Sequence, residues 1–174
     1  MKNMKHLLAL AVTMMMACSA MAQLNIQGTR YSFELNNDDW RYLRTFDMGD
    51  GNTTYLYCYV GEVLLDESGD TVLPYLRLYI QQNYSDDLYQ FIYERYEDQP
   101  YQSLNEWTKG LGLPKTGGLG YEGIYTNPTE HRDYRFMMTY FRDKRTVVEF
   151  RLETTRETYE EMEVKFKNVL STIK

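Results

Sequence analysis

The chain has 174 residues and a formal net charge of −6 at pH 7. Such an acidic surface repels nucleic-acid phosphates and anionic lipid, and the basic residues form no long run. Charge therefore argues against nucleic acid as a partner, and the length fits one domain.

Residues 1–22 have the three regions of an export signal. Two lysines near the start precede an apolar run over residues 7–17, and Ala20 and Ala22 place small residues where a signal peptidase reads them. We expect cleavage before Gln23, since the run is shorter than the roughly 20 residues that span a bilayer. The mature protein is then periplasmic or extracellular, with no membrane insertion.

Cys18 gives a second interpretation of this segment, as the lipidated residue of a bacterial lipoprotein. The match is poor, because Met15 stands where an aliphatic residue is usual. Plain cleavage would leave Cys58 and His131 as the only cysteine and histidine, so no internal disulfide is expected. Cys58 lies in an alternating run and is expected to be a small buried hydrophobe.

Alternating and turn-rich segments predict that strands make up much of the mature chain. The predicted strands cover residues 31–35, 40–46, 55–65, 75–81, 121–126, 133–142 and 146–153. Segments 50–52 and 143–144 are expected to form tight hairpin turns.

Helices are expected in three places. The first covers residues 85–97, with Ser85 as its N-cap and an apolar stripe on one side. The last begins at a capping box formed by Thr154 and Glu157 and is strongly amphipathic to the end of the chain. A short helix is expected over residues 103–109, before a glycine- and proline-containing breaker.

This order of elements predicts one α+β domain over residues 23–174, with helices packed on an antiparallel β-sheet. The chain resembles the PsbP-like α/β/α sandwich in its aromatic strand leading into Trp40, its helix after the fourth strand, its Gly-rich segment before Tyr121, its 142–144 hairpin and its C-terminal amphipathic helix. The resemblance covers nearly all of the mature chain, as a pattern of elements. Residues 36–39 depart from it, because the family often has a proline in that loop.

The PsbP-like family includes extrinsic photosystem subunits, a nuclear protein that binds the GTPase Ran, and many exported bacterial proteins of unassigned role. The resemblance therefore implies binding or assembly more than catalysis. It assigns no site residue to this chain.

Tyrosine is the residue type that stands out, since all 17 tyrosines follow residue 22. In strands 55–65 and 75–81, tyrosines alternate with apolar residues. If the tyrosine sides of these strands coincide, one face can stack sugar rings or hold a peptide. The members of this expected platform are Tyr55, Tyr57, Tyr59, Tyr75, Arg77 and Tyr79. In the alternative, helix 85–97 covers the face and the tyrosines are structural.

Motifs for catalysis, metals and cofactors are weak. The acidic turns 47–52 and 66–70 lack the oxygen spacing of an EF-hand. The run 115–120 lacks the Gly-Lys-Thr or Gly-Lys-Ser end of a phosphate loop, and His131 has no cysteine cluster beside it for zinc. We therefore expect no catalytic residue, no metal site and no cofactor.

The expected function is that of an exported, non-enzymatic binding or accessory domain that acts on a protein or a glycan. Two alternatives stay open: a small hydrolase built on a pair of carboxylates, and a structural component of an envelope assembly. A cleft with two carboxylates roughly 5–10 Å apart would favour the hydrolase, whereas an exposed aromatic patch would favour binding. Neither the ligand nor the oligomeric state is indicated.

Overall fold

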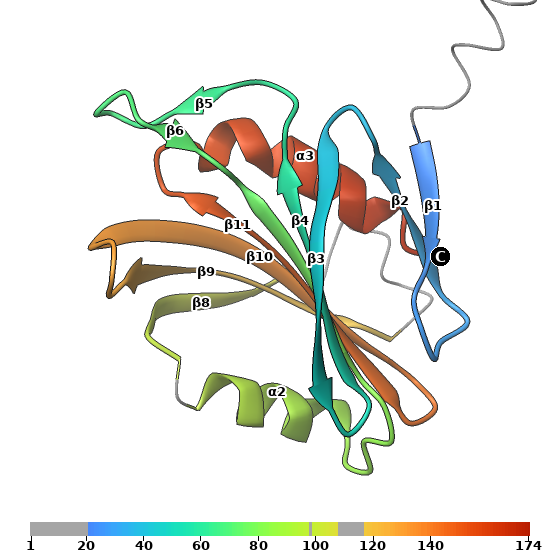
Figure 1. Cartoon of the computed structure of the whole chain (residues 1–174). Coiled ribbons are helices and arrows are strands. Elements are labelled where there is room, and N and C mark those ends of the chain that lie inside the picture. The colour runs from blue at the N-terminus through green and yellow to red at the C-terminus, as the bar shows by residue number, and fades with distance from the viewer. Residues whose placement is uncertain (1–20, 98, 108–116) are drawn as a thin grey trace, which may run out of the picture.

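A seven-stranded antiparallel sheet is the middle layer of the fold (Figure 1). The computed structural model describes residues 21–97, 99–107 and 117–174. Its elements are β1 (Met21–Asn25), β2 (Ser32–Asn36), β3 (Trp40–Gly49), β4 (Asn52–Tyr59), β5 (Leu64–Leu65), β6 (Thr71–Val72), β7 (Tyr75–Gln81), α2 (Leu88–Tyr96), β8 (Tyr101–Trp107), β9 (Leu119–Asn127), β10 (Arg132–Asp143), β11 (Thr146–Thr155) and α3 (Tyr159–Ser171). The order in the large sheet is β3-β4-β7-β11-β10-β9-β8, and β1-β2 and β5-β6 form separate antiparallel pairs.

Helices α2 and α3 lie on opposite sides of the sheet (Figure 1). On one side, which we call the α3 face, α3 and the β1-β2 pair enclose the larger hydrophobic core. On the other side, the α2 face, a smaller core surrounds Phe91 and Ile92 of α2. The predicted α+β class, with helices packed on an antiparallel sheet in a PsbP-like arrangement, is confirmed.

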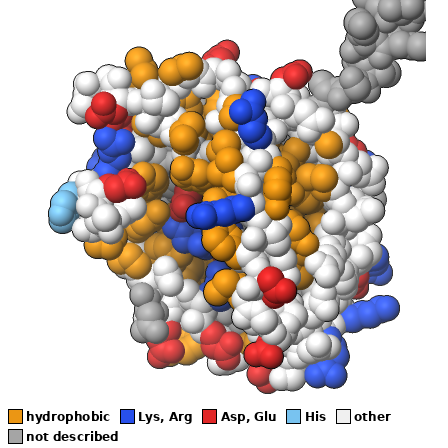
Figure 2. All heavy atoms as spheres, viewed as in Figure 1, with side chains coloured by type: hydrophobic (Ala, Val, Ile, Leu, Met, Phe, Trp, Pro, Cys, Tyr) orange, Lys and Arg blue, Asp and Glu red, His pale blue; other side chains and the backbone are white. Residues whose placement is uncertain are grey.

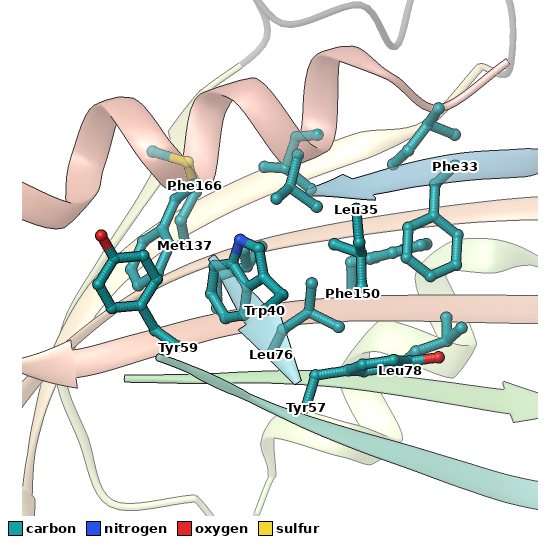
Figure 3. Packing of buried hydrophobic residues seen from close by; sticks show 14 of the residues in the cluster. Phe33, Leu35, Trp40, Tyr57, Tyr59, Leu76, Leu78, Met137, Phe150 and Phe166 are labelled. Atoms are coloured by element: carbon teal, nitrogen blue, oxygen red, sulfur yellow. The ribbon is translucent and has the colours of Figure 1, made fainter. Parts of the chain in front are cut away.

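The larger core is built from strand residues that alternate toward α3. Phe33 of β2 packs edge-on against Phe150 of β11, with ring centroids 4.9 Å apart. Trp40 of β3 lies beside Phe166 of α3, with centroids 6.3 Å apart, and Figure 3 shows these rings between the sheet and the helix. Burying each such side chain contributes roughly 1.5–3 kcal/mol. This packing fixes Trp40 at the border between the sheet and the β1-β2 pair.

Both long helices begin later than their sequence patterns predict. Helix α2 is capped by Asp87, whose Oδ1 accepts a hydrogen bond of 2.8 Å from the backbone N–H of Gln90, so Ser85 is not the cap. Helix α3 begins at Tyr159, because Thr155 still pairs with β10 as the last residue of β11. The predicted capping box at Thr154 is therefore wrong, and the Thr154 hydroxyl lies in the strand, 2.7 Å from the hydroxyl of Thr158.

Three other boundaries differ from the sequence predictions. Residues 101–107 form strand β8 on the edge beside β9, where a short helix was expected, and residues 108 and 109 lie outside the described part. The expected strand 55–65 is divided into β4 and the short β5. The last hairpin turns at Lys144, whose φ is 55°, because Asp143 still pairs with Thr146.

The expected export signal falls almost entirely outside the described residues, as do Cys18 and the start of the Gly-rich run at residues 115–116. Strand β1 begins at Met21, two residues before the expected cleavage point, and Met21 pairs with Asn36. Among the described residues, no helix is long and apolar enough to cross a membrane.

Candidate ligand-binding site

The pairing register of β4 with β7 divides the predicted tyrosine platform between two faces. Tyr55 lies opposite Leu78 and Tyr57 lies opposite Leu76, so the β4 tyrosines share the α3 face with the leucines of β7. The other side of β7 points to the α2 face. The expectation of one shared face is corrected: Tyr55, Tyr57 and Tyr59 lie on the α3 face, and Tyr75, Arg77 and Tyr79 lie on the α2 face.

On the α2 face, Arg77 belongs to a charged network centred on Glu149 of β11. The Glu149 carboxylate is 2.9 Å from Nη2 of Arg77 and 3.0 Å from Nε of Arg95, which reaches it from α2. It also accepts a hydrogen bond of 3.1 Å from the hydroxyl of Tyr140. The guanidinium of Arg95 in turn lies over the ring of Tyr79, 4.3 Å from its centroid. Arg77 and Tyr79 are therefore occupied by contacts within the protein.

Electrostatics hold Glu149 in its charged form. The residue is 1% exposed, and burial alone would raise the pKa of its carboxyl. The guanidiniums of Arg77 and Arg95 outweigh that effect and lower the pKa of Glu149 to about 2. A carboxyl group of this kind neither donates nor accepts protons near neutral pH.

A second ion pair, Arg151 with Glu153, continues the network along β11. Nη2 of Arg151 is 2.7 Å from Glu153, and Nη1 donates to the hydroxyl of Tyr101. Burial raises the pKa of Tyr125, whose hydroxyl donates to Glu153, to about 12. Tyr101 and Tyr125 are thus hydrogen-bonded to these charged groups.

A hollow of about 450 Å³ lies beside this network, at the end of the sheet next to the β5-β6 pair. We call it the sheet-end hollow; Tyr75, Tyr134 and Thr155 are among the residues that line it. Some of its polar groups have partners, since Arg132 pairs with Asp66 and the Tyr134 hydroxyl donates to Glu130. The Tyr75 hydroxyl, by contrast, makes no hydrogen bond with a described residue.

A second hollow, of about 320 Å³, opens on the α3 face between the β1-β2 pair and the β3-β4 hairpin. We call it the hairpin groove. Its lining residues are Ala22, Leu24, Leu35, Asn37, Trp40, Tyr42, Thr45, Tyr55 and Tyr57. None of these carries a charge, and four are aromatic. Figure 2 shows hydrophobic side chains gathered at the surface between β3 and β1 of Figure 1.

Two polar atoms of the hairpin groove have no partner among the described residues. Trp40 and Tyr57 are 4% and 8% exposed, yet the Trp40 indole N–H and the Tyr57 hydroxyl make no hydrogen bond with any described residue. Trp40 also lines a neighbouring hollow beside α3, whereas Tyr57 lines the hairpin groove. The Tyr57 hydroxyl is therefore available to a ligand.

The aromatic walls of the groove form a corner. The rings of Tyr42 and Tyr57 are 5.7 Å apart at an angle of 70°, and Tyr42 is 52% exposed. Its hydroxyl lies 2.8 Å from that of Thr45, which fixes the orientation of the outer ring. Burial raises the pKa of Tyr57 to about 12, so its hydroxyl stays protonated and can donate.

Sequence reasoning included Tyr55 and Tyr57 in a candidate site but missed Trp40 and Tyr42. The sequence contained a pattern that could have identified them, because Trp40 and Tyr42 occur two residues apart in a predicted strand and so share a face. The predicted hairpin turn at residues 50–52 indicated that these two strands pair. It did not indicate the register, with its shift between Tyr42 and Arg44, that places Tyr42 opposite Tyr57.

Other candidate sites from the sequence have structural explanations. Asp66 accepts hydrogen bonds from the backbone N–H groups of Asp70 and Ser68, which lower the pKa of its carboxyl together with the Arg132 guanidinium. Cys58 is buried, as expected. Within the described ranges, no group of three or more histidine, cysteine, aspartate or glutamate side chains could hold a metal ion.

Comparison with known proteins identifies the fold. No family model and no curated protein matches the sequence. The crystal structure of LpqN, involved in cell envelope biogenesis of Mycobacterium tuberculosis, is 11% identical, with coverage of 88% of this chain and 90% of that chain and a TM-score of 0.50. The solution structure of CyanoP, the cyanobacterial PsbP of Synechocystis, is 12% identical, with coverage of 90% and 92% and a TM-score of 0.50.

A variant of Mog1 is 8% identical, with coverage of 87% of this chain and 86% of that chain and a TM-score of 0.50. At such identities, a match in structure shows the fold alone. In all three comparisons the match covers most of both chains. The chain therefore has the PsbP-like fold that its order of elements predicted.

Proposed function

We propose that this protein is an exported, non-enzymatic binding domain whose ligand site is the hairpin groove. The observation that carries the proposal is the composition of that groove: four aromatic side chains, no charged residue, and a Tyr57 hydroxyl without a partner among the described residues. Hollows that bind ligands are typically apolar and aromatic, with a few polar groups that orient the ligand.

The ionisable groups on the α2 face support binding over hydrolysis. A carboxylate-based hydrolase needs one carboxyl group with a raised pKa that acts as an acid, beside a second carboxylate. The carboxyl groups of Asp66, in the β5-β6 turn, and of Glu149, on the α2 face, both have a lowered pKa, the opposite of what such an acid needs. Glu149 is also bonded to two arginines and a tyrosine, so its role is structural.

Export to the cell envelope agrees with the expected signal at residues 1–22. LpqN, which has a similar fold, is involved in cell envelope biogenesis. From LpqN we propose only a general location, the cell envelope, for this chain. We assign the chain no pathway.

The test is purification of the full chain from its host under native conditions, with two matched variants. Tyr42→Ala removes the exposed wall of the groove, and Tyr89→Ala removes a tyrosine of similar type on α2, which is 68% exposed. We expect a bound component that is kept by the wild type and by Tyr89→Ala and lost by Tyr42→Ala.

Two results would contradict the proposal. If a partner is retained equally by all three proteins, the interpretation as a structural component of an envelope assembly is favoured, because the interaction does not use the groove. If none of the three retains a component, a ligand-binding role for the groove is refuted.

A further inference from the structure

We propose that the hairpin groove binds a neutral saccharide, which packs on the ring of Tyr42 and receives a hydrogen bond from the hydroxyl of Tyr57. This inference rests on the proposed function and names its ligand class. Three properties of the groove carry it: the absence of charge, the geometry of its rings, and the placement of its polar atoms.

The absence of charge excludes ligands with buried ionic groups. Every side chain that lines the groove is uncharged. A phosphate or carboxylate bound there would lose water without gaining an ionic partner, which costs several kcal/mol. By contrast, the sheet-end hollow is lined by Asp70, Glu130 and Arg132 and suits a neutral ligand less well.

The rings of Tyr42 and Tyr57 meet edge to face, so their contact occupies at most one face of one ring. Because Tyr42 is half exposed, part of its ring remains open to a ligand. A sugar ring has an apolar C–H side that packs on an aromatic face, while its hydroxyls stay at the edge. The corner between the two rings provides such a face with a polar atom beside it.

The polar atoms argue against a purely apolar ligand. The hydroxyls of Tyr42, Thr45 and Tyr57 and the amide of Asn37 belong to the lining. A hydrocarbon ligand would remove water from the Tyr57 hydroxyl without replacing its hydrogen bond, at a cost of about 1–3 kcal/mol. A saccharide replaces that bond, since each of its hydroxyls can accept as well as donate.

An extended peptide is the competing ligand, and its expected binding position is a free edge of the sheet. A peptide strand binds by main-chain hydrogen bonds to a free sheet edge. In the described sheet, β3 and β8 are the edge strands, so such a peptide would pair along the free edge of one of them, through main-chain groups and not through the aromatic side chains of the groove. Expected cleavage before Gln23 would also remove Ala22 and widen the groove at one end. It would place the new α-amino group of Gln23 next to Leu24 at that end, so the absence of charge applies to the side chains that line the groove.

The probes are three neutral trisaccharides, maltotriose, cellotriose and chitotriose, with trigalacturonate as the charged control, titrated by calorimetry against the full chain. We expect saturable binding of at least one neutral probe and no binding of trigalacturonate. Tyr42→Ala should weaken binding at least fivefold, as expected for loss of an aromatic packing partner. Tyr57→Phe should weaken it threefold or more, and Tyr89→Ala should leave it unchanged.

The Tyr57→Phe variant keeps the ring and loses a hydroxyl that bonds to no described residue, so its melting temperature should stay near that of the wild type. The inference is overturned if no neutral trisaccharide binds, if trigalacturonate binds equally, or if Tyr42→Ala binds as the wild type does. If a host component is still lost by Tyr42→Ala while no trisaccharide binds, the proposed binding function stands and the ligand class is wrong. A peptide among the retained components would identify the competing ligand.

Discussion

Replacing Glu149 by glutamine tests whether the charged network on the α2 face is structural. The substitution keeps the shape of the side chain and removes the charge that faces Arg77 and Arg95. Breaking one partner of a buried ion pair costs about 3–5 kcal/mol. The arginine side chains are 35% and 31% exposed, and the amide oxygen can still accept, so we expect the lower end of that range.

The pKa of Glu149 gives the same magnitude independently. A fall from an ordinary 4.5 to about 2 corresponds to about 3 kcal/mol of differential stability. Because the folded-state pKa is the lower one, this stability is fully present above about pH 4.5 and is lost as the pH falls toward about 2. Glu149→Gln should therefore be less stable than the wild type by about 3 kcal/mol at pH 7, and the difference should shrink through that pH window.

Urea unfolding at pH 7 and at several pH values down to 2.5 measures this difference, with Glu157→Gln, an exposed glutamate at the start of α3, as the matched control. The control should change the free energy of unfolding by no more than about 0.5 kcal/mol. The reasoning would be refuted by a Glu149→Gln variant within about 1 kcal/mol of the wild type at pH 7. It would equally be refuted by a difference that stays constant down to pH 2.5.

Four further substitutions test three local features by the same unfolding measurement. Asp87→Ala should cost about 1 kcal/mol through loss of the α2 cap, whereas Ser85→Ala should cost less than about 0.5 kcal/mol; the reverse order would restore Ser85 as the cap. Tyr159→Phe should be neutral or stabilising by up to about 1 kcal/mol, because its buried hydroxyl has no partner, and clear destabilisation would reveal a missed one. Gly61→Ala should cost about 1–3 kcal/mol, because its Cβ would lie 2.6 Å from the hydroxyl of Tyr59, and an unchanged stability would contradict that contact.

Local patterns predicted the elements whose periodicity is unambiguous. Strand β7 has the bounds that its alternation predicted, and α3 buries the stripe that its spacing predicted. A short helix was expected where strand β8 lies, on the basis of the breaker that follows residue 109, whereas the strand conformation depends on pairing with β9. The local pattern of a strand does not reveal which other strand of the sequence will pair with it.

The site was only half predictable, because faces depend on register. Between β4 and β7 the chain forms the β5-β6 pair, so no tight turn sets the alignment of Tyr57 with Leu76. Helices cover part of both faces of the sheet, and a tyrosine side chain packs well on either face. The decisive constraint is the leucine side of β7, which must face the larger core and which brings the β4 tyrosines to the same face.

Two properties together separate a binding tyrosine from a structural one in this fold: whether it lines a hollow and whether its hydroxyl has a partner. The Tyr159 hydroxyl also has no partner, but it is buried in the core. On the α2 face, Tyr140 donates to Glu149, Tyr101 accepts from Arg151, and Tyr125 donates to Glu153, so a ligand there would have to break bonds that hold charged groups. On the α3 face, the hydroxyl of Tyr57 reaches an uncharged groove with no such bond to a described residue. A ligand at Tyr57 gains a hydrogen bond without breaking one, whereas a ligand at Tyr140 must first disrupt the network. This asymmetry, more than the number of tyrosines, makes the hairpin groove the place for a ligand.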